Sequence, residues 1–162
     1  MSLQAAAMTY RLEIKPLEPE HSRQAFPLIQ SICPQLNLAN WTDFVEGVAE
    51  TLGPKNAGII AAFTARGYIH GLFSYAVIPS LQHGKILGVD NFVAFEFPDR
   101  LGVTRELVAR MDTLALGHNW CAVHVDLPDP AIKGSKQADP LLEAFEANGH
   151  NLQRFGLCKF VD

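Results

Sequence analysis

A spacing suited to binding an anion occurs where a loop passes into a helix, in residues 99–105 (Asp-Arg-Leu-Gly-Val-Thr-Arg). A glycine lets the backbone approach a phosphate closely, and the first N–H groups of a helix point at such a ligand with partial positive charge. Arg100 and Arg105 add positive charge, Thr104 adds a hydroxyl, and the charge of the nearby Asp99 opposes binding. The alternative is a plain loop-to-helix junction that Thr104 caps.

Two carboxylates precede this junction and are candidate general bases. Asp90 lies within the apolar segment 85–95, where regular alternation places it on a face with mostly apolar residues. Burial there would raise the pKa of Asp90, which suits a group that accepts a proton. The alternative is a bulge or turn over 88–91, in which Asp90 only bonds backbone. Glu96, at the end of the same segment, is the second candidate, with the role of a solvated loop residue as its alternative.

These candidates need a scaffold, and the periodicity of the apolar residues predicts alternating strands and helices. Alternation or continuous apolar runs predict strands over 10–17, 58–65, 68–78, 85–95, 121–127 and 155–161. Apolar residues three and four apart predict helices over 21–36, 42–52, 104–117 and 140–148. The predicted order is β-α-α-β-β-β-α-β-α-β. We therefore expect an α/β (α+β) fold whose mixed, mainly antiparallel central sheet is flanked by helices.

Composition limits the size and the partners of this fold. The chain has 162 residues, of which 48% are apolar, so we expect one domain over 9–162 with residues 1–8 as a leader. A net charge of −4, without a run of Lys or Arg, argues against a nucleic acid or an anionic membrane as partner. Three scattered cysteines suit a reducing cytoplasm. Cys121 and His124 have a ligand-like spacing, but no second pair completes a metal site, and we expect none.

The element order from Tyr10 to Val161 resembles the GNAT superfamily of acetyl-CoA-dependent N-acyltransferases. In that family the long fourth strand leads into a Gln/Arg-x-x-Gly-x-Gly/Ala loop and then a helix. The matching stretch here runs from Asp99 to Thr104, and it keeps the central glycine at Gly102 while both ends of the motif differ. The pattern is therefore degenerate, and the order of elements carries most of the resemblance.

A second landmark of the family is a Leu-Tyr-x-x-x-Gly-Phe pattern around the last helix. Here Phe145 takes the place of the tyrosine, Gly149 keeps the glycine, and His150 replaces the aromatic residue. In many members that tyrosine protonates the leaving thiolate, which Phe145 cannot do. Another donor, such as Tyr75, Ser74 or His150, or else solvent, would have to act in its place.

The resemblance implies an acyl-CoA co-substrate, namely acetyl-CoA, and a small-molecule or peptide amine as the acceptor. It implies a base on the fourth strand, for which Asp90 is the first candidate and Glu96 the second. The residues that it implies for the cofactor are Phe92, Val93, Ala94 and Phe95 along the pantetheine, and Arg100, Leu101, Gly102, Val103, Thr104 and Arg105 around the pyrophosphate. The alternative function is a catalytically reduced module of the same fold that binds CoA or another ligand.

The last predicted strand, 155–161, has apolar residues on both faces, which is typical of a covered strand. The family usually has two strands in this region, whereas 151–162 leaves room for one good strand or two very short ones. A sheet that ends there would expose unpaired backbone groups. We therefore expect a homodimer in which a second subunit covers this strand, with the loop 128–138 as the alternative cover.

Overall fold

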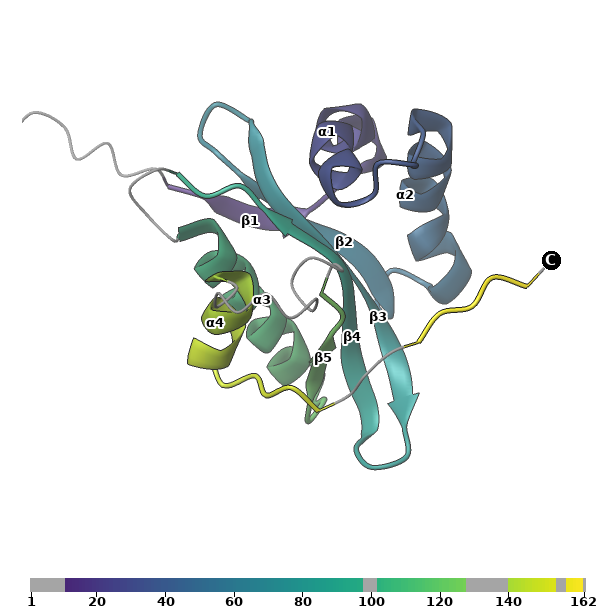
Figure 1. Cartoon of the computed structure of the whole chain (residues 1–162), viewed down its shortest axis with the longest axis vertical. Coiled ribbons are helices and arrows are strands. Elements are labelled where there is room, and N and C mark those ends of the chain that lie inside the picture. The colour runs from purple at the N-terminus through teal and green to yellow at the C-terminus, as the bar shows by residue number, and fades with distance from the viewer. Residues whose placement is uncertain (1–10, 98–101, 128–139, 154–156, 162) are drawn as a thin grey trace, which may run out of the picture.

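The computed structural model describes residues 11–97, 102–127, 140–153 and 157–161, and within them five strands form one sheet between layers of helices (Figure 1). The elements in chain order are β1 (Glu13–Pro16), the short 3-10 helix η1 (Pro19–His21), α1 (Ser22–Ile32), α2 (Leu38–Leu52), β2 (Ala57–Phe63), β3 (Ile69–Ser80), β4 (Gly84–Ala94), α3 (Gly102–Gly117), β5 (Val123–Val125) and α4 (Pro140–Ala147).

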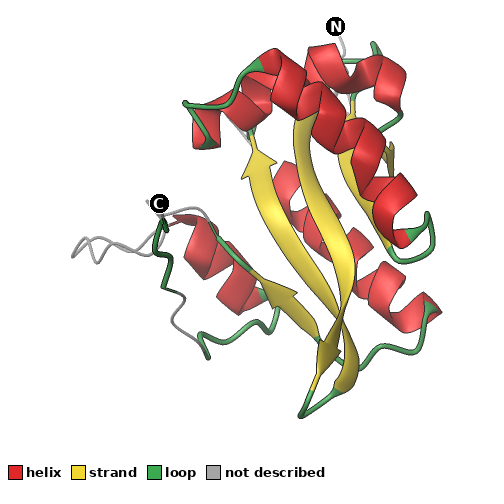
Figure 2. Cartoon of the chain, turned by 90° about the vertical axis from the view of Figure 1, so that its right-hand side faces the viewer, coloured by secondary structure: helices red, strands yellow, loops and turns green. Residues whose placement is uncertain are grey.

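The strands lie in the order β1-β2-β3-β4-β5, so each strand pairs with its neighbour in sequence (Figure 2). The first four strands are antiparallel, and β5 runs parallel to β4. The mixed, mainly antiparallel sheet that the sequence predicts is thus confirmed. The parallel step follows from α3, because a strand can return in the same direction only through a crossover connection.

Alternating side chains divide the core into two layers, one on each face of the sheet. Ile60 and Ala62 of β2 pack with α3 and α4, whereas Ile59 and Ala61 pack with α1 and α2. Figure 1 shows the two pairs of helices on opposite sides of the sheet. Both faces are therefore covered, which explains why the central strands are continuous apolar runs.

Several element boundaries differ from those predicted. The first helix ends at Ile32 rather than at 36, and α2 begins at Leu38 rather than at 42. The earlier start has a local cause, because the Asn37 side chain accepts a hydrogen bond of 2.8 Å from the Asn40 N–H and caps the helix. The proposed Thr104 cap is wrong, since α3 already includes Gly102.

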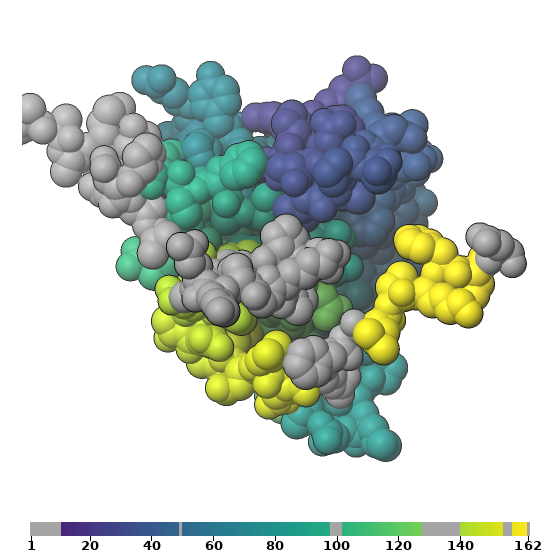
Figure 3. All heavy atoms as spheres, in the orientation of Figure 1, coloured from purple at the N-terminus to yellow at the C-terminus, as the bar shows by residue number. Residues whose placement is uncertain are grey.

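The predicted C-terminal strand over 155–161 is not formed by its described residues, 157–161. Leu157, Phe160 and Val161 are 100%, 90% and 85% exposed. Its atoms are the bright yellow spheres at the right-hand edge of the molecule (Figure 3). A strand requires a hydrogen-bonded neighbour, and none of the described strands pairs with 157–161, so the alternating pattern is not sufficient here.

Candidate functional site

The strands β4 and β5 pair only over a short stretch, and β4 then continues alone. The pairing covers Leu87–Val89 on β4 and Val123–Val125 on β5, and the Asp126 N–H donates to the Val89 carbonyl at 2.9 Å. Beyond this point β4 runs on to Ala94 without a described strand on its β5 side. Such an open strand edge offers backbone donors and acceptors to an extended ligand.

A β-bulge marks the residue at which β4 leaves β5. Between the pairs Leu72–Val93 and Ser74–Asp90, β4 contains one residue more than β3. Asn91 lies in this extra step with φ +54°, a conformation that asparagine tolerates better than most residues. The buried Ser74 hydroxyl donates to the Asp90 carbonyl at 3.1 Å and accepts from the Asn91 side-chain amide at 2.9 Å. The bulge is therefore fixed by a side-chain network from the neighbouring strand.

Asp90 stands directly before the bulge, and its side chain is exposed. The expectation of a buried carboxyl is therefore wrong, because the bulge interrupts the alternation on which it depended. One carboxylate oxygen accepts the Asn91 N–H at 2.7 Å. The structure thus has the bulge and backbone contact that the sequence left open as the alternative. It also places this carboxylate where the open edge of β4 begins.

Glu96 lies between the end of β4 and the start of α3, and its carboxylate caps α3. Its two oxygens accept the backbone N–H groups of Val103 at 2.9 Å and Thr104 at 2.7 Å. Amides of the first helical turn have no partner within the helix, so a carboxylate satisfies them and interacts favourably with the helix dipole. Two of the backbone donors that the sequence suggests for a phosphate are thus bound to a carboxylate of the same chain.

The helix start and the end of β4 lie close together because β3 has a glycine between them. Gly71 pairs with Ala94, and a Cβ atom at Gly71 would lie 2.8 Å from Val103 Cγ1 and 2.9 Å from Leu107 Cδ1. The absence of a side chain therefore lets the first turns of α3 pack directly on the sheet. Gly102, in contrast, has open space around it and has no positive φ.

The predicted cofactor residues occupy different environments along this region. Phe92 and Val93 are buried on opposite faces of the sheet, Ala94 is half-buried and Phe95 is exposed. At the helix start, Val103 and Thr104 are buried, and Arg105 is exposed. The predicted residues Arg100 and Leu101 lie outside the described part of the chain.

Phe145 anchors α4 on β4 just after the bulge. Its ring is 2% exposed and meets the ring of Phe92 edge-on at 5.0 Å and that of His150 at 5.1 Å. His150 Nδ1 is buried and has no hydrogen-bond partner within the part of the chain that the structure describes. A buried imidazole nitrogen without a partner is costly in a protein interior, so it is a candidate for a role with a ligand.

The other two proton donors considered from the sequence are placed differently. The Ser74 hydroxyl hydrogen is engaged with the Asp90 carbonyl. Tyr75 lies on the α3 side of the sheet, and burial raises the pKa of its phenol while the charge of Arg110 lowers it. Tyr75 pairs with Val89, one strand inward from the edge that β4 opens. Neither residue lies at the open edge itself.

Among the described residues, no helix is long and apolar enough to cross a membrane. The same part of the chain contains no group of three or more His, Cys, Asp or Glu side chains arranged to hold a metal ion. A depression of about 680 Å³ lies at the β1–β2 edge, between Arg11, Lys15, His21 and Phe63, and includes none of the predicted site residues.

No family model and no curated protein sequence matches the chain, whereas many solved structures match over nearly its whole length. An aminoglycoside N-acetyltransferase in complex with CoA has a TM-score of 0.72 at 12% identity, over 93% of this chain and 95% of that one. Glucosamine-6-phosphate N-acetyltransferase from Arabidopsis thaliana has a TM-score of 0.67 at 14% identity, over 94% and 99%. The chain has the GNAT fold.

The same fold occurs in a protein described as a transcriptional regulator, from Bacillus halodurans C-125. It has a TM-score of 0.75 at 12% identity, over 93% of this chain and 100% of that one. Within this GNAT fold, sequence reasoning missed the network around Asn91 and the capping contact of Glu96. The one signal for the cap was an acidic residue shortly before a helix start, where negative charge is favourable.

Proposed function

We propose that the chain is an acyl-CoA-dependent N-acyltransferase that uses acetyl-CoA and transfers the acetyl group to a small-molecule or peptide amine. The observation that carries this proposal is the separation of β4 from β5 at a fixed bulge, with an acid at the bulge and a helix start beyond it. The GNAT fold, which this chain shares with an acetyltransferase in complex with CoA, supports it.

In this proposal the pantetheine lies along the open edge of β4, at Phe92 to Phe95. Its amides would exchange hydrogen bonds with backbone groups that have no strand beside them in the described structure. The pyrophosphate lies toward the start of α3, at Gly102, Val103 and Thr104, with Arg105 adding positive charge. The fold itself thus positions the donor, and placement supplies most of what acyl transfer needs.

The reaction requires one proton acceptor and one proton donor. The neutral amine attacks the acyl carbon, an N–C bond forms, and Asp90 accepts the proton that the amine loses. The C–S bond then breaks, and the thiolate of CoA takes a proton from His150 in its protonated form. Solvent restores both residues to their starting states. His150 is favoured over Tyr75 and Ser74 because its buried Nδ1 has no partner among the described residues and lies next to the ring that replaces the usual tyrosine.

A thiol-release assay with acetyl-CoA and a panel of amines tests this function, together with calorimetric titration of acetyl-CoA. The expected result is saturable binding of acetyl-CoA and amine-dependent release of free CoA. The second candidate is a module that binds a ligand without transfer, and two observations favour it: Phe145 at the donor position and Glu96 on the helix amides. If acetyl-CoA binds but no amine causes release of free CoA, the chain is the binding module and not the transferase.

We also propose that the chain forms a homodimer, with a second copy covering the exposed apolar side chains at 157–161. Exposed apolar surface of this kind is costly in water unless a partner covers it. Light scattering at micromolar concentration should give twice the mass of the 17.8 kDa chain. Phe160→Ser should weaken the dimer, whereas Leu81→Ser, at an equally exposed turn, should not. A wild-type monomer would reject the dimer.

We also propose that the protein is located in the cytoplasm, because its three cysteines are free and exposed.

A further inference from the structure

We propose that Glu96 is a built-in competitor for the pyrophosphate of CoA, so that this chain selects its acyl donor mainly by the pantetheine arm. The inference rests on the proposed function, because it concerns the same helix start. It goes beyond that function because it proposes that the Glu96 side chain determines which part of the acyl donor the protein recognises.

The contact occupies two of the backbone donors at the helix start that an anion would use. Glu96 places one oxygen on the Val103 amide and the other on the Thr104 amide, at 2.9 and 2.7 Å. Each amide has a single hydrogen, so it cannot serve Glu96 and a phosphate oxygen fully at the same time. The carboxylate also repels a second anion at this distance. A pyrophosphate must therefore displace the side chain before it can bind these amides.

The position of Glu96 is fixed by its two neighbours in sequence, which both contact His70 on β3. The Phe95 N–H donates to the His70 carbonyl at 2.7 Å, and the ring of Phe97 stacks on the His70 ring at 4.4 Å. Backbone placement on both sides holds the carboxylate against α3. Rotation of the Glu96 side chain alone would free the amides, so the backbone need not move for displacement.

The sequence of the helix start agrees with a weakened phosphate site. The GNAT pattern has a small residue at the position of Thr104, and here that side chain is buried against the core. Thr104 therefore presents only its backbone N–H at the helix start, and that N–H is bound to Glu96. Recognition of the donor is thus left to the open edge of β4, where the pantetheine lies in the proposed function.

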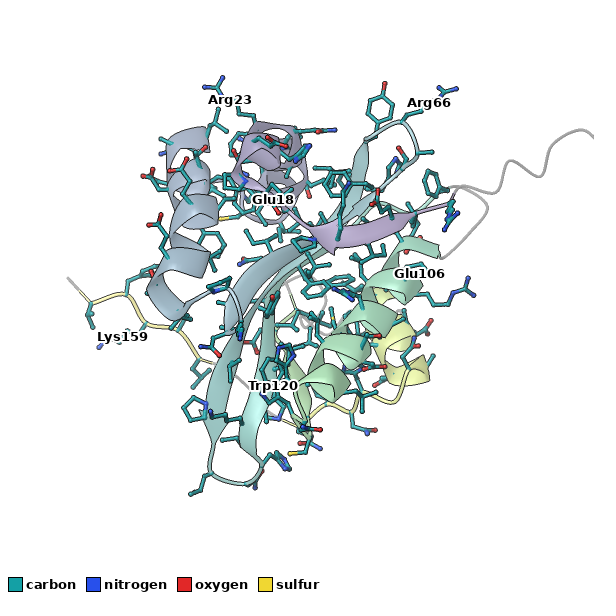
Figure 4. The ribbon with its side chains drawn as sticks, turned by 180° about the vertical axis from the view of Figure 1, so that it is seen from behind. Glu18, Arg23, Arg66, Glu106, Trp120 and Lys159 are labelled. Atoms are coloured by element: carbon teal, nitrogen blue, oxygen red, sulfur yellow. The ribbon has the colours of Figure 1, made fainter. Side chains whose placement is uncertain are left out.

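The test compares two substitutions at Glu96 for their effect on the binding of two ligands. Binding of acetyl-CoA and of S-acetyl-pantetheine, which lacks the pyrophosphate and the nucleotide, is measured by calorimetry for each form of the protein. Glu96→Gln removes the charge and Glu96→Ala removes the side chain. Glu106→Gln is the matched control, because Glu106 is an exposed acid on α3, the helix that Glu96 caps (Figure 4), and its replacement changes the net charge by the same amount.

We expect Glu96→Ala to raise the affinity for acetyl-CoA about tenfold over wild type, and Glu96→Gln to give a smaller gain. Neither variant should change the affinity for S-acetyl-pantetheine, and Glu106→Gln should change neither ligand. Circular dichroism of each variant checks that the fold is retained. A loss or no change in acetyl-CoA affinity on Glu96→Ala overturns the inference, as does an equal gain for both ligands.

Inorganic pyrophosphate as a third ligand separates the failure of this inference from that of the proposed function. If all forms bind acetyl-CoA equally, the inference fails and the proposed function stands. If no form binds either acetylated donor but Glu96→Ala gains pyrophosphate binding, the competitor role of Glu96 stands and the proposed function fails. If no form binds any of the three ligands, both fail.

Discussion

Replacing Gly71 by alanine should destabilise the protein because β3 and α3 are in direct contact at this residue. A Cβ atom there would meet Val103 Cγ1 at 2.8 Å, Leu107 Cδ1 at 2.9 Å and the Val93 carbonyl oxygen at 2.9 Å. The carbonyl belongs to the adjacent strand and cannot retreat without disturbing the sheet, and both side chains are fully buried. Overpacking of this kind should lower the free energy of unfolding by about 2–3 kcal/mol.

Urea unfolding followed by circular dichroism measures the loss, and a thermal scan should show a fall in melting temperature of about 5–10 °C. Gly102→Ala is the matched control, because a Cβ atom there meets nothing within 4 Å and the residue opens a helix. It should change the free energy of unfolding by no more than about 0.5 kcal/mol, in the stabilising direction. Equal effects at the two glycines would refute the packing of α3 on β3 described above.

Three further predictions concern the proposed chemistry and one buried phenol. Asp90→Asn should lower kcat about 100-fold in the thiol-release assay, while the affinity for acetyl-CoA stays unchanged. Unchanged turnover would mean that Asp90 is not the base and that its only role is the contact with the Asn91 N–H at the bulge. His150→Gln should lower kcat about tenfold without raising KM for acetyl-CoA, and His118→Gln, at an exposed site, should leave kcat at the wild-type value. Burial raises the pKa of Tyr75 above 10.0, so the folded state keeps the phenol proton to a higher pH than the unfolded state does. The free energy of unfolding should therefore fall as the pH rises above 10. In the Tyr75→Phe variant, the part of this fall that comes from Tyr75 should be absent.

The parts of the fold that the sequence predicted correctly depend on local periodicity. Leu107, Val108 and Met111 recur at helical spacing, and all three are buried in α3. The apolar runs of β2, β3 and β4 likewise predicted three consecutive antiparallel strands. Burial of one face or of both faces determines the spacing of apolar residues within a few positions of the sequence. Such elements can therefore be predicted without knowing their neighbours in the fold.

The parts that were missed or wrong depend on contacts between separate elements. The bulge at Asn91 exists because Ser74, on the next strand, bonds both Asp90 and Asn91. Regular alternation alone places Asp90 on a mostly apolar face, whereas the bulge, which the sequence left open as the alternative, exposes it. The segment 157–161 has the alternation of a strand, but pairing needs a neighbour that no periodicity can supply.

The cap on α3 has a similar origin and a larger consequence for function. A threonine near a helix start and a glycine before it predict a local cap and an open anion site, whereas the chain uses Glu96, seven and eight residues before the amides it binds. Only the return of α3 onto β3 at Gly71 brings those amides within reach of a side chain at the end of β4. The same close packing of sheet and helix therefore also lets the chain cap, with its own carboxylate, the helix start that we propose for the pyrophosphate. Similarity of fold alone cannot distinguish a helix start whose amides are free to bind an anion from one whose amides are already bound. In this chain a single carboxylate, that of Glu96, makes this difference.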